Sequence, residues 1–393
     1  MSAPRSFAFF GSSLVSSYWN GAATYYRGLI RALHELGHRV TFYEPDAYGR
    51  QQHRDIDDPP WARVIVYPPT EAAAAQALES ARGSDVLVKT SGVGVLDAFL
   101  ESAVLDRARA GALVGFLDVD APATLERVER TPNDPFRGLV PRYDFVFTYG
   151  GGAPVVRAYT ALGARVCVPI YNALDPDTHH PVPREPRFES DLAFLGNRLP
   201  DREHRVDEFF FRCARRMPWR RFLLGGSGWE GKPLPNNVTW IGHVPTADHN
   251  ALNVTPLAVL NVSRDSMARF GFSPATRVFE AGGAGACLVT DAWEGIELFL
   301  EPGREVLVAS SGEDVADHLR SLAPERAREI GRAARRRVLA EHTYARRARE
   351  VEAVLDGRLG SREAAPGFAA DPQVTSAPVT SGPTTAAPAT RLP

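Results

Sequence analysis

Features of disulfide-linked and metal-binding proteins are scarce in this sequence. Its 393 residues include three cysteines, Cys167, Cys213 and Cys287, which are widely separated and lie in apolar settings. This pattern predicts reduced core residues rather than a disulfide framework or a cysteine metal site. The histidines show no metal-ligand spacing, and the adjacent pair at 179 and 180 is expected to be solvated in a linker. We therefore expect no metal and no bound cofactor.

Long apolar runs and an excess of one charge are missing as well. No segment approaches the roughly 18 to 20 apolar residues that a membrane-spanning helix needs. Lysine and arginine total 45 against 47 aspartates and glutamates, so the net charge of -2 gives no reason to expect nucleic acid or anionic membranes as partners. The apolar stretch after Met1 is interrupted by Ser12 and Ser13, unlike a secretion signal. We expect a cytoplasmic protein with a small-molecule partner and, at most, peripheral membrane contact.

The sequence does contain a repeated alternation of apolar strands and helices. With 44% hydrophobic residues, the chain is long enough for two globular domains. Most strand candidates are continuous apolar runs, which is typical of parallel strands covered by helices on both faces. They lie at residues 6–11, 39–45, 63–68, 85–90, 112–118, 143–149, 165–170, 191–196, 219–226, 238–243, 257–263, 286–291 and 305–310. The alternation predicts an α/β fold with doubly wound parallel sheets.

A segment rich in proline and charge, residues 171–190, divides this alternation in two. We predict an N-terminal Rossmann-like domain with its linker over residues 1–186, and a second Rossmann-like domain with closing helices over 187–357. Residues 358–393 are mostly small polar residues and prolines, which cannot bury enough apolar area to offset ordering entropy, so a disordered tail is expected. Two such domains would form a cleft beyond the carboxyl ends of their strands, where ligands of this fold bind.

Glu280 is the first candidate for that cleft. It closes the segment "ATRVFE", which we interpret as a short helix, and precedes "AGGAGA". A carboxylate there could accept hydrogen bonds from both hydroxyls of a ribose. Gly282, Gly283 and Gly285 would leave backbone N–H groups unobstructed for a diphosphate beside a helix N-terminus. The alternative is a solvent-facing glutamate and a glycine turn needed only for packing.

The segment "LNVSRDSMARFGFSPATRVFEAGGAGACLVTD" and its continuation through "GRAARRRVLAEHTYARRARE" resemble the C-terminal domain of the spore-maturation CgeB-like glycosyltransferases. These are GT-B enzymes of the group 1 glycosyl transferases, and the resemblance covers residues 190–350 well and the N-terminal half loosely. It implies a GT-B fold with two Rossmann-like domains facing across a cleft and a nucleoside-diphosphate sugar bound mainly by the second domain. It places Glu280 at the ribose, with Arg277 one helical turn before it. It also implies that the last helix, near residues 343–355, crosses back to the first domain.

One departure from the family pattern concerns stereochemistry. Related retaining enzymes carry a second glutamate eight positions upstream of the ribose glutamate, and Phe272 occupies that position here. Retention of anomeric configuration therefore cannot be inferred.

Three arginines are candidates for the donor diphosphate. Arg198 and Arg202 open the second domain, where GT-B enzymes often place cations around the diphosphate, and Arg264 follows a strand nearby. Fixed cations aimed at the departing nucleoside diphosphate would stabilise its developing charge without a metal. The alternative for each is an ordinary surface arginine.

The first domain is expected to hold the acceptor and, if the reaction inverts, the general base. Asp118 and Asp120 follow a buried strand, and a carboxylate at that edge could take the proton of an acceptor hydroxyl. We prefer Asp120, with Asp118 as alternate, against an Asx turn or helix cap. The loop containing Gly11, Ser12, Ser13 and Asn20 is a second candidate, for the acceptor or a phosphate.

The predicted function is transfer of a sugar from a nucleoside diphosphate to an acceptor hydroxyl, the acceptor being a glycan, lipid, protein or small molecule. One alternative is a GT-A enzyme that binds a metal through the D-x-D triplet of residues 118–120. Another is an oxidoreductase, although the first helix lacks a G-x-G-x-x-G opening. The last is a non-catalytic GT-B-like protein that binds a sugar nucleotide during surface-layer assembly, which the missing upstream glutamate keeps open.

Overall fold

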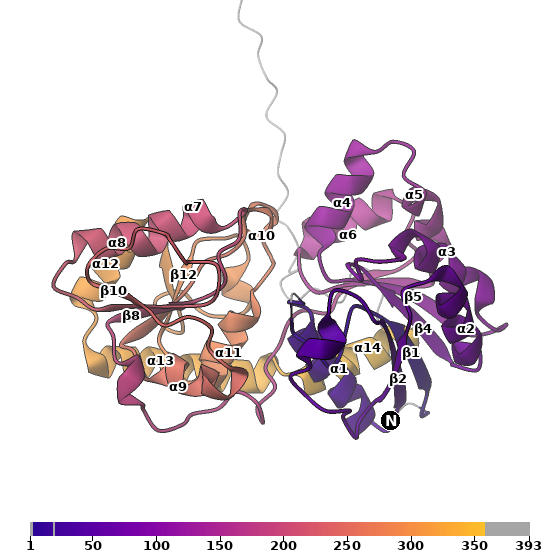
Figure 1. Cartoon of the computed structure of the whole chain (residues 1–393), viewed down its shortest axis with the longest axis horizontal. Helices are drawn as coiled ribbons and strands as arrows, with labels where there is room; N and C mark the ends of the chain where they lie inside the picture. Colours follow the sequence, from indigo (N-terminus) through magenta and orange to yellow (C-terminus); the bar gives the residue numbers. More distant parts are fainter. Residues whose placement is uncertain (1–2, 19, 358–393) are drawn as a thin grey trace, which may run out of the picture.

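The computed structural model describes residues 3–18 and 20–357, which form two α/β domains side by side (Figure 1). The first domain is built on a parallel sheet with strand order β3-β2-β1-β4-β5-β6-β7. Its strands are β1 (Ser6–Phe10), β2 (Arg39–Pro45), β3 (Arg63–Tyr67), β4 (Val86–Thr90), β5 (Leu113–Asp118), β6 (Phe145–Thr148) and β7 (Cys167–Pro169). Its helices are α1 (Ala23–Glu35), α2 (Glu71–Ala81), α3 (Asp97–Arg107), α4 (Ala121–Arg130), α5 (Phe136–Leu139) and α6 (Gly152–Ala161).

The second domain repeats this arrangement with the order β10-β9-β8-β11-β12-β13, again with parallel neighbours. Its strands are β8 (Leu192–Leu195), β9 (Phe222–Gly225), β10 (Val238–Trp240), β11 (Ala258–Asn261), β12 (Leu288–Asp291) and β13 (Leu307–Ala309). Its helices are α7 (Glu203–Val206), which continues through a π-helical segment (Asp207–Phe211) into α8 (Arg212–Arg216), then α9 (His249–Val254), α10 (Asp265–Phe270), α11 (Thr276–Ala284), α12 (Gly312–Ser321), α13 (Pro324–Glu341) and α14 (Tyr344–Leu355). The α/β fold with two Rossmann-like sheets is therefore confirmed.

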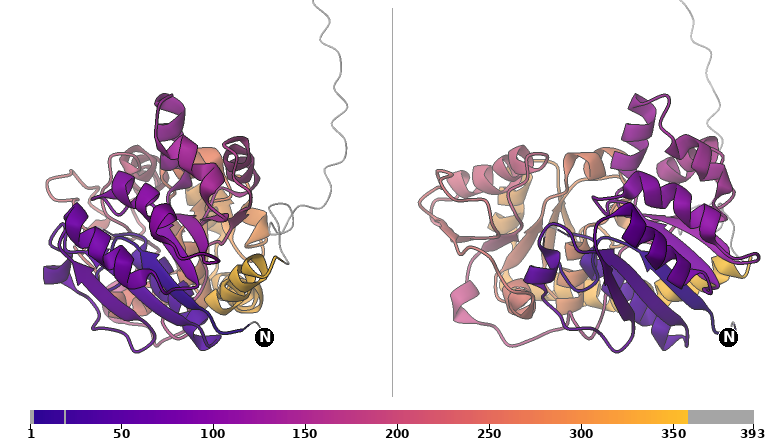
Figure 2. Two further views of the ribbon diagram at one scale, coloured as in Figure 1. Left: turned by 90° about the vertical axis from the view of Figure 1, so that its right-hand side faces the viewer. Right: turned by 45° about the vertical axis from the view of Figure 1, so that its right-hand side comes forward.

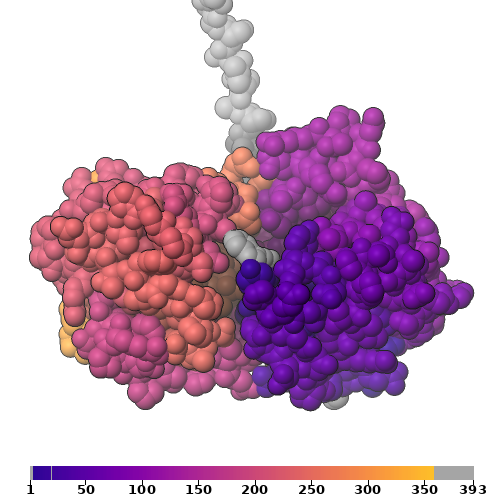
Figure 3. Space-filling model, viewed as in Figure 1, coloured from indigo at the N-terminus to yellow at the C-terminus, as the bar shows by residue number. Residues whose placement is uncertain are grey.

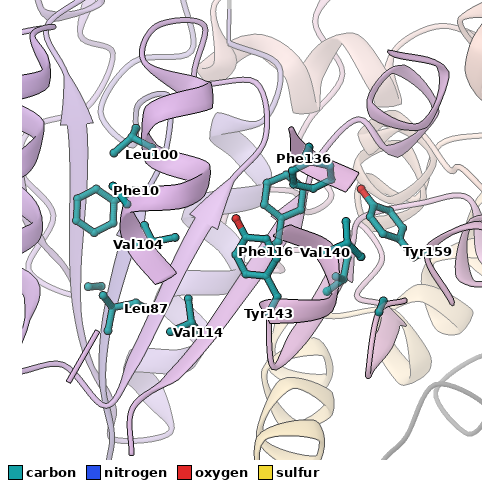
Figure 4. Packing of buried hydrophobic residues seen from close by; sticks show 14 of the residues in the cluster. Phe10, Leu87, Leu100, Val104, Val114, Phe116, Phe136, Val140, Tyr143 and Tyr159 are labelled. Carbon is teal, nitrogen blue, oxygen red and sulfur yellow. The ribbon is translucent and has the colours of Figure 1, made fainter. Parts of the chain in front are cut away.

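Both faces of the first sheet are buried, as the continuous apolar strands predict. On one face, Phe10 and Leu87 pack beneath Leu100 of α3, and Phe116 stacks at an angle against Phe136 of α5 (Figure 4). The opposite face is covered by α1 and α14, whose apolar side chains form a separate buried cluster with those of β1 and β2. Helices on both faces leave the loops at the carboxyl ends of the strands as the free edge of each sheet.

The chain crosses back to the first domain at its described end. Helix α14 leaves the second domain and packs along α1 beneath the first sheet (Figures 1 and 2). The approach is close, because a Cβ added to Gly28 of α1 would lie 2.2 Å from the ring of Tyr344. An ion pair between Arg5 and Asp356, at 2.6 Å, joins the two ends of the described chain. This crossing helix ties the two domains together.

A second contact between the domains lies at the other end of the cleft, where α10 packs beside α4 (Figure 1). The amide of Gly151 donates to the carbonyl of Phe272 at 2.8 Å, and Phe272 adopts a φ of 47°. Its side chain packs against Gly295, where a Cβ would lie 2.3 Å from the ring. The residue at the position of the family's upstream glutamate thus helps to join the domains.

Two further sequence expectations concern the C-terminal tail and a membrane-spanning helix. The disordered tail predicted from residue 358 lies outside the described residues. Within residues 3–18 and 20–357, none of the helices combines the length and the apolar character that a membrane crossing requires.

Candidate active site

A cavity of about 500 Å³ lies between the two domains, and a furrow separates the two lobes in the space-filling view (Figure 3). Its walls are the segments that follow β1, β2, β4, β5, β6 and β7 in the first domain and β8 and β11 in the second, together with the start of α11. Ligands of open α/β sheets bind at such carboxyl edges, and the volume falls within the range of small-molecule sites. We take this cavity as the candidate active site.

Arg202 and Arg264 bring positive charge to the second-domain wall of the cavity. The only hydrogen bond of the Arg202 side chain within the described chain goes to the carbonyl of Asn197, at 2.5 Å, and its Nε is buried without a partner. Burial and the neighbouring Arg277 and Arg264 lower the pKa of Arg202 to about 10, so it stays protonated at neutral pH. This guanidinium is available to an anion.

Arg264 links the two walls of the cavity. Its Nε donates to Asp201 at 2.5 Å, and its Nη1 lies 3.3 Å from Oδ2 of Asp120 in the first domain. Although burial acts to lower the pKa of Arg264, the hydrogen bond to Asp201 and the charge of Asp120 raise it. The cation and the candidate general base are therefore in contact.

The other two arginines are placed differently. Arg198 forms a bidentate pair with Glu203, at 2.7 and 2.8 Å, and is not among the residues that line the cavity. The expectation that it faces the diphosphate is therefore not met in this conformation. Arg277 has no hydrogen bond or ion pair within the described residues, and burial lowers its pKa while Glu280 opposes that effect.

The two aspartates after β5 have opposite environments. Asp118 is fully buried and accepts hydrogen bonds from Ser91 at 2.7 Å and Tyr159 at 2.5 Å, and burial raises its pKa. It also accepts from the amide of Asp120 at 3.0 Å. Asp118 therefore cannot serve as the alternate base, because it is shielded from an acceptor and instead positions the turn. Asp120 lines the cavity and retains the candidate role.

Glu280 lies in α11, which continues past it to Ala284, and it lines a cavity shared by residues of both domains. It is 8% exposed and lines a smaller cavity beside the first, together with Arg27 of α1 and Thr276. Burial opposes ionisation, but His179, Arg277 and His249 outweigh it and lower the pKa of Glu280. Glu280 does not line the larger cavity, so its place at the ribose stays a prediction.

The glycines after Glu280 do not form the phosphate loop expected from the sequence. Gly282 and Gly283 belong to the last turn of α11, and Gly285 caps the helix with a φ of 79°. A Cβ on Gly283 would lie 2.3 Å from Leu174 and 2.8 Å from the carbonyl of His179, and one on Gly282 would lie 3.1 Å from Val338 of α13. These glycines permit close packing, and the end of α11 that lines the cavity is its N-terminus at Thr276.

The loop after β1 is braced by its own side chains. The Ser12 hydroxyl donates to Oδ1 of Asn20 at 2.9 Å, and the side-chain Nδ2 of Asn20 donates to the carbonyl of Ser13 at 2.8 Å. Ser13 donates to buried Glu44 at 2.9 Å, and a Cβ on Gly11 would lie 2.4 Å from Phe42. Of the expected residues, only Ser12 and Asn20 line the cavity.

Several lining residues were not singled out in the sequence. Arg50 lies in the short helix after β2 and donates to the carbonyls of Ser12 and Val93, each at 3.2 Å. Tyr149 and Asn172 follow β6 and β7 at the same sheet edge. Their position just beyond strand ends was a usable signal for Tyr149 and Asn172, whereas nothing in the local sequence distinguishes Arg50 from a surface arginine.

The expectation that the histidines are solvated and not grouped as metal ligands needs one correction. Within the described chain, His179, His249 and Glu280 form a group whose ligand atoms lie within 4.8 Å of one another. His179 is buried rather than solvated, while His180 is exposed. The hypothesis that Asp118 and Asp120 bind a metal as a D-x-D triplet is not supported, because Asp118 is fully buried and Asp120 is paired with Arg264.

Two Rossmann-like domains that face each other across a ligand-sized cleft define the GT-B fold. The glycosyl transferase-like family model matches residues 202–353, which is most of the second domain. No curated protein sequence matches the chain.

Solved structures show the same fold over nearly the whole described chain. A sucrose-phosphate synthase from Thermosynechococcus elongatus is similar with a TM-score of 0.67 and 14% identity, covering 90% of this chain and 98% of that one. Anabaena HepE in complex with UDP and glucose is similar with a TM-score of 0.64 and 14% identity, covering 90% of this chain and 100% of that one. An alpha-glucosyltransferase in complex with UDP and DNA is similar with a TM-score of 0.64 and 11% identity, covering 90% of this chain and 100% of that one. The shared two-domain fold sets aside the single-domain GT-A alternative.

Proposed function

We propose that this protein is a glycosyltransferase that moves a sugar from a nucleoside-diphosphate sugar to an acceptor hydroxyl. The observation that carries the proposal is the interdomain cavity, where Arg202 and Arg264 of the second domain face Asp120 of the first. The family-model match over the second domain supports a transferase. The UDP and UDP-glucose complexes of Anabaena HepE make UDP sugars the first donors to test.

The donor is expected to lie mainly against the second domain. Glu280 would accept hydrogen bonds from the ribose hydroxyls, and the N-terminus of α11 at Thr276 would direct amide N–H groups toward the diphosphate. Arg202 has an unpartnered Nε there, so it can neutralise phosphate charge without breaking an existing ion pair. Fixed cations that stabilise the leaving diphosphate supply the function that a catalytic metal has in other transferases.

Asp120 would remove the acceptor proton as the hydroxyl oxygen attacks the anomeric carbon and the bond to the diphosphate breaks. Arg264 contacts Asp120 in the structure, at 3.3 Å. A bound diphosphate would compete for Arg264 and free the carboxylate for proton transfer. This role for Asp120 applies to an inverting reaction, and the packing of Phe272 between the domains leaves no upstream glutamate for the family's retaining pattern.

The acceptor and the narrower family are separate hypotheses. The resemblance to CgeB-like proteins is carried by residues 260–319 and 331–350 and stays a hypothesis about close relatives. The acceptor would enter along the loops after β1 and β4, where Ser12 and Gly92 line the cavity. The near-neutral charge gives no reason to expect a nucleic acid acceptor.

A non-catalytic sugar-nucleotide-binding role is the second candidate, because Phe272 stands where retaining relatives have a glutamate. A donor screen separates the two: UDP, GDP and TDP sugars are supplied with mixed acceptors, and release of the nucleoside diphosphate is measured with and without EDTA. We expect release from at least one donor, undiminished by EDTA. Nucleotide binding without release would favour the binding protein, and loss of release in EDTA would contradict the metal-free mechanism.

A further inference from the structure

Two histidines and a glutamate from three separate segments meet beside the candidate active site. His179 belongs to the interdomain linker, His249 is the first residue of α9, and Glu280 lies in α11. One ligand atom of each lies within 4.8 Å of the other two. The closest printed approach is 4.0 Å, between Nε2 of His179 and Oε1 of Glu280.

That approach is too long for a hydrogen bond. His179 is 4% exposed, and its Nε2 has no hydrogen-bond partner among the described residues. Leaving a buried polar atom unpaired costs about 1–3 kcal/mol, so such an atom indicates a missing partner. His179, His249 and Glu280 all line one cavity of about 90 Å³.

The chemistry of the three side chains fits a transition metal of the zinc type. Imidazole nitrogens and one carboxylate are common zinc ligands, and three protein ligands leave a fourth position open. Two ligand atoms on one tetrahedral zinc lie about 3.4 Å apart, given bond lengths of about 2.0–2.2 Å. Small side-chain rotations would therefore bring the observed atoms to bonding positions.

The surroundings prepare the histidines for this role. Nε2 of His249 lies 3.3 Å from the carbonyl of Val244, and an N–H directed there would leave Nδ1 with a free lone pair and hold the ring in place. Arg27 lines the same cavity and brings positive charge that a bound cation would have to tolerate, and the carboxylate of Glu280 is the acidic side chain among the three proposed ligands.

We propose that His179, His249 and Glu280 bind a divalent transition metal ion of the zinc class, and that this metal and the donor nucleotide exclude each other. The second clause rests on the proposed function, in which Glu280 receives the ribose. Zinc would then inhibit transfer rather than support it. Removing zinc would raise nucleotide affinity.

The metal site is tested on the full chain after dialysis against EDTA. Zinc affinity is measured against a chromophoric chelator, and Co²⁺ is added to record the visible absorption of a four-coordinate site. We expect zinc binding at micromolar concentration or tighter. His179→Ala and His249→Gln should each weaken it by more than the roughly 10- to 100-fold that loss of an outer-shell partner costs.

His180→Ala is the matched control, because His180 is the exposed neighbour of His179. It should bind zinc as the unmodified chain does. Thermal melts without metal check that each variant folds, and added zinc should raise the melting temperature of the control but not of His179→Ala. Absence of zinc binding to the unmodified chain, or equal binding by all variants, would overturn the proposal.

The competition is tested separately by titrating UDP at buffered free zinc. Zinc should weaken UDP binding to the unmodified chain and to His180→Ala, while the UDP affinity of His179→Ala should not respond to zinc. Zinc binding without any effect on UDP would overturn the exclusion and count against Glu280 as the ribose ligand. Zinc binding in a chain that binds no tested nucleotide would leave the metal site standing and contradict the proposed function.

Discussion

At the scale of single residues, Glu280 carries the account of donor binding. It is buried at the domain boundary, with its pKa lowered by His179, Arg277 and His249 against the effect of burial. Glu280→Gln keeps the shape but loses the charge, and should weaken UDP binding by about 1–3 kcal/mol in metal-free buffer, measured by calorimetry. Glu297→Gln, at an exposed position of the same domain, should change nothing. Equal affinity in the two variants would remove Glu280 from the donor site.

Asp120 carries the account of proton transfer. Asp120→Asn should lower turnover by about two to four powers of ten without weakening nucleotide binding, because the nucleotide is held by the other domain and Arg264 is released from its pair.

Asp118→Ala should instead lower the free energy of unfolding by at least about 2 kcal/mol, since Ser91, Thr124 and Tyr159 all lose a buried acceptor. Turnover and urea unfolding of both variants distinguish these roles. Near-normal transfer by Asp120→Asn would exclude it as the base.

The sequence could place a residue at the cavity where its position beyond a strand end or the family resemblance was informative, while the roles of these residues stay predictions. Arg264 and Asp120 follow strand ends, whereas Arg202 came from the family resemblance, and all three line the cavity. Spacing could not reveal that Arg198 is held by Glu203, because that pairing depends on side-chain geometry. It also could not bring His179 to His249, since their contact exists only after the linker packs on the second domain.

At the scale of elements, substituting the glycines of α11 tests whether the end of this helix is needed for close packing or for binding a phosphate group. Gly283→Ala should destabilise the fold by about 1–3 kcal/mol, because the new Cβ would meet the backbone carbonyl of His179 at 2.8 Å. Gly138→Ala in α5 is the control, since nothing lies within 4 Å of its Cβ position. Urea unfolding measures both. A Gly283→Ala protein of normal stability that fails to bind nucleotide would restore the phosphate loop.

The turn between α13 and α14 contains a buried histidine that should make stability depend on pH. His342 packs against Phe279 and Phe299, and burial, followed by the charges of Arg347, Arg337 and Arg346, lowers its pKa to about 3. The unfolded chain, with a pKa of about 6.5, therefore binds the proton more readily. The stabilising contribution is present above about pH 6.5 and is lost as pH falls toward 3.

His342→Gln removes this titration while keeping an acceptor for Arg347, which lies 3.1 Å from Nδ1 of His342. Between pH 7 and pH 5, the unmodified chain should lose about 2 kcal/mol more stability than the variant. Urea unfolding at the two pH values measures the difference. Parallel losses in both proteins would show that His342 is not the titrating group.

The strands were predictable because continuous apolar runs are a strong signal for buried parallel strands. The extent of α11 was not. Glycine weakens a helix in isolation, so "AGGAGA" favours a loop, but the close approach of Leu174 and Val338 rewards the absence of side chains. Tertiary packing therefore decided the end of this helix.

At the scale of the whole molecule, two contacts set the cleft. Helix α14 joins the second domain to α1, and the Phe272 loop joins it to the start of α6 at Gly151. The resemblance to GT-B enzymes implied the first contact. The second could not be foreseen, because it depends on Phe272 adopting a φ of 47°.

The central claim is that a nucleoside-diphosphate sugar occupies the cavity between the domains. The most direct measurement is a crystal structure of the metal-free chain with UDP or a non-transferable UDP sugar. The account predicts the ribose hydroxyls within hydrogen-bonding distance of Glu280 and the diphosphate against Arg202, Arg264 and the start of α11. Nucleotide bound elsewhere, such as in the separate cavity of about 510 Å³ lined by Arg184 and Arg328, with the interdomain cavity left to solvent, would contradict it.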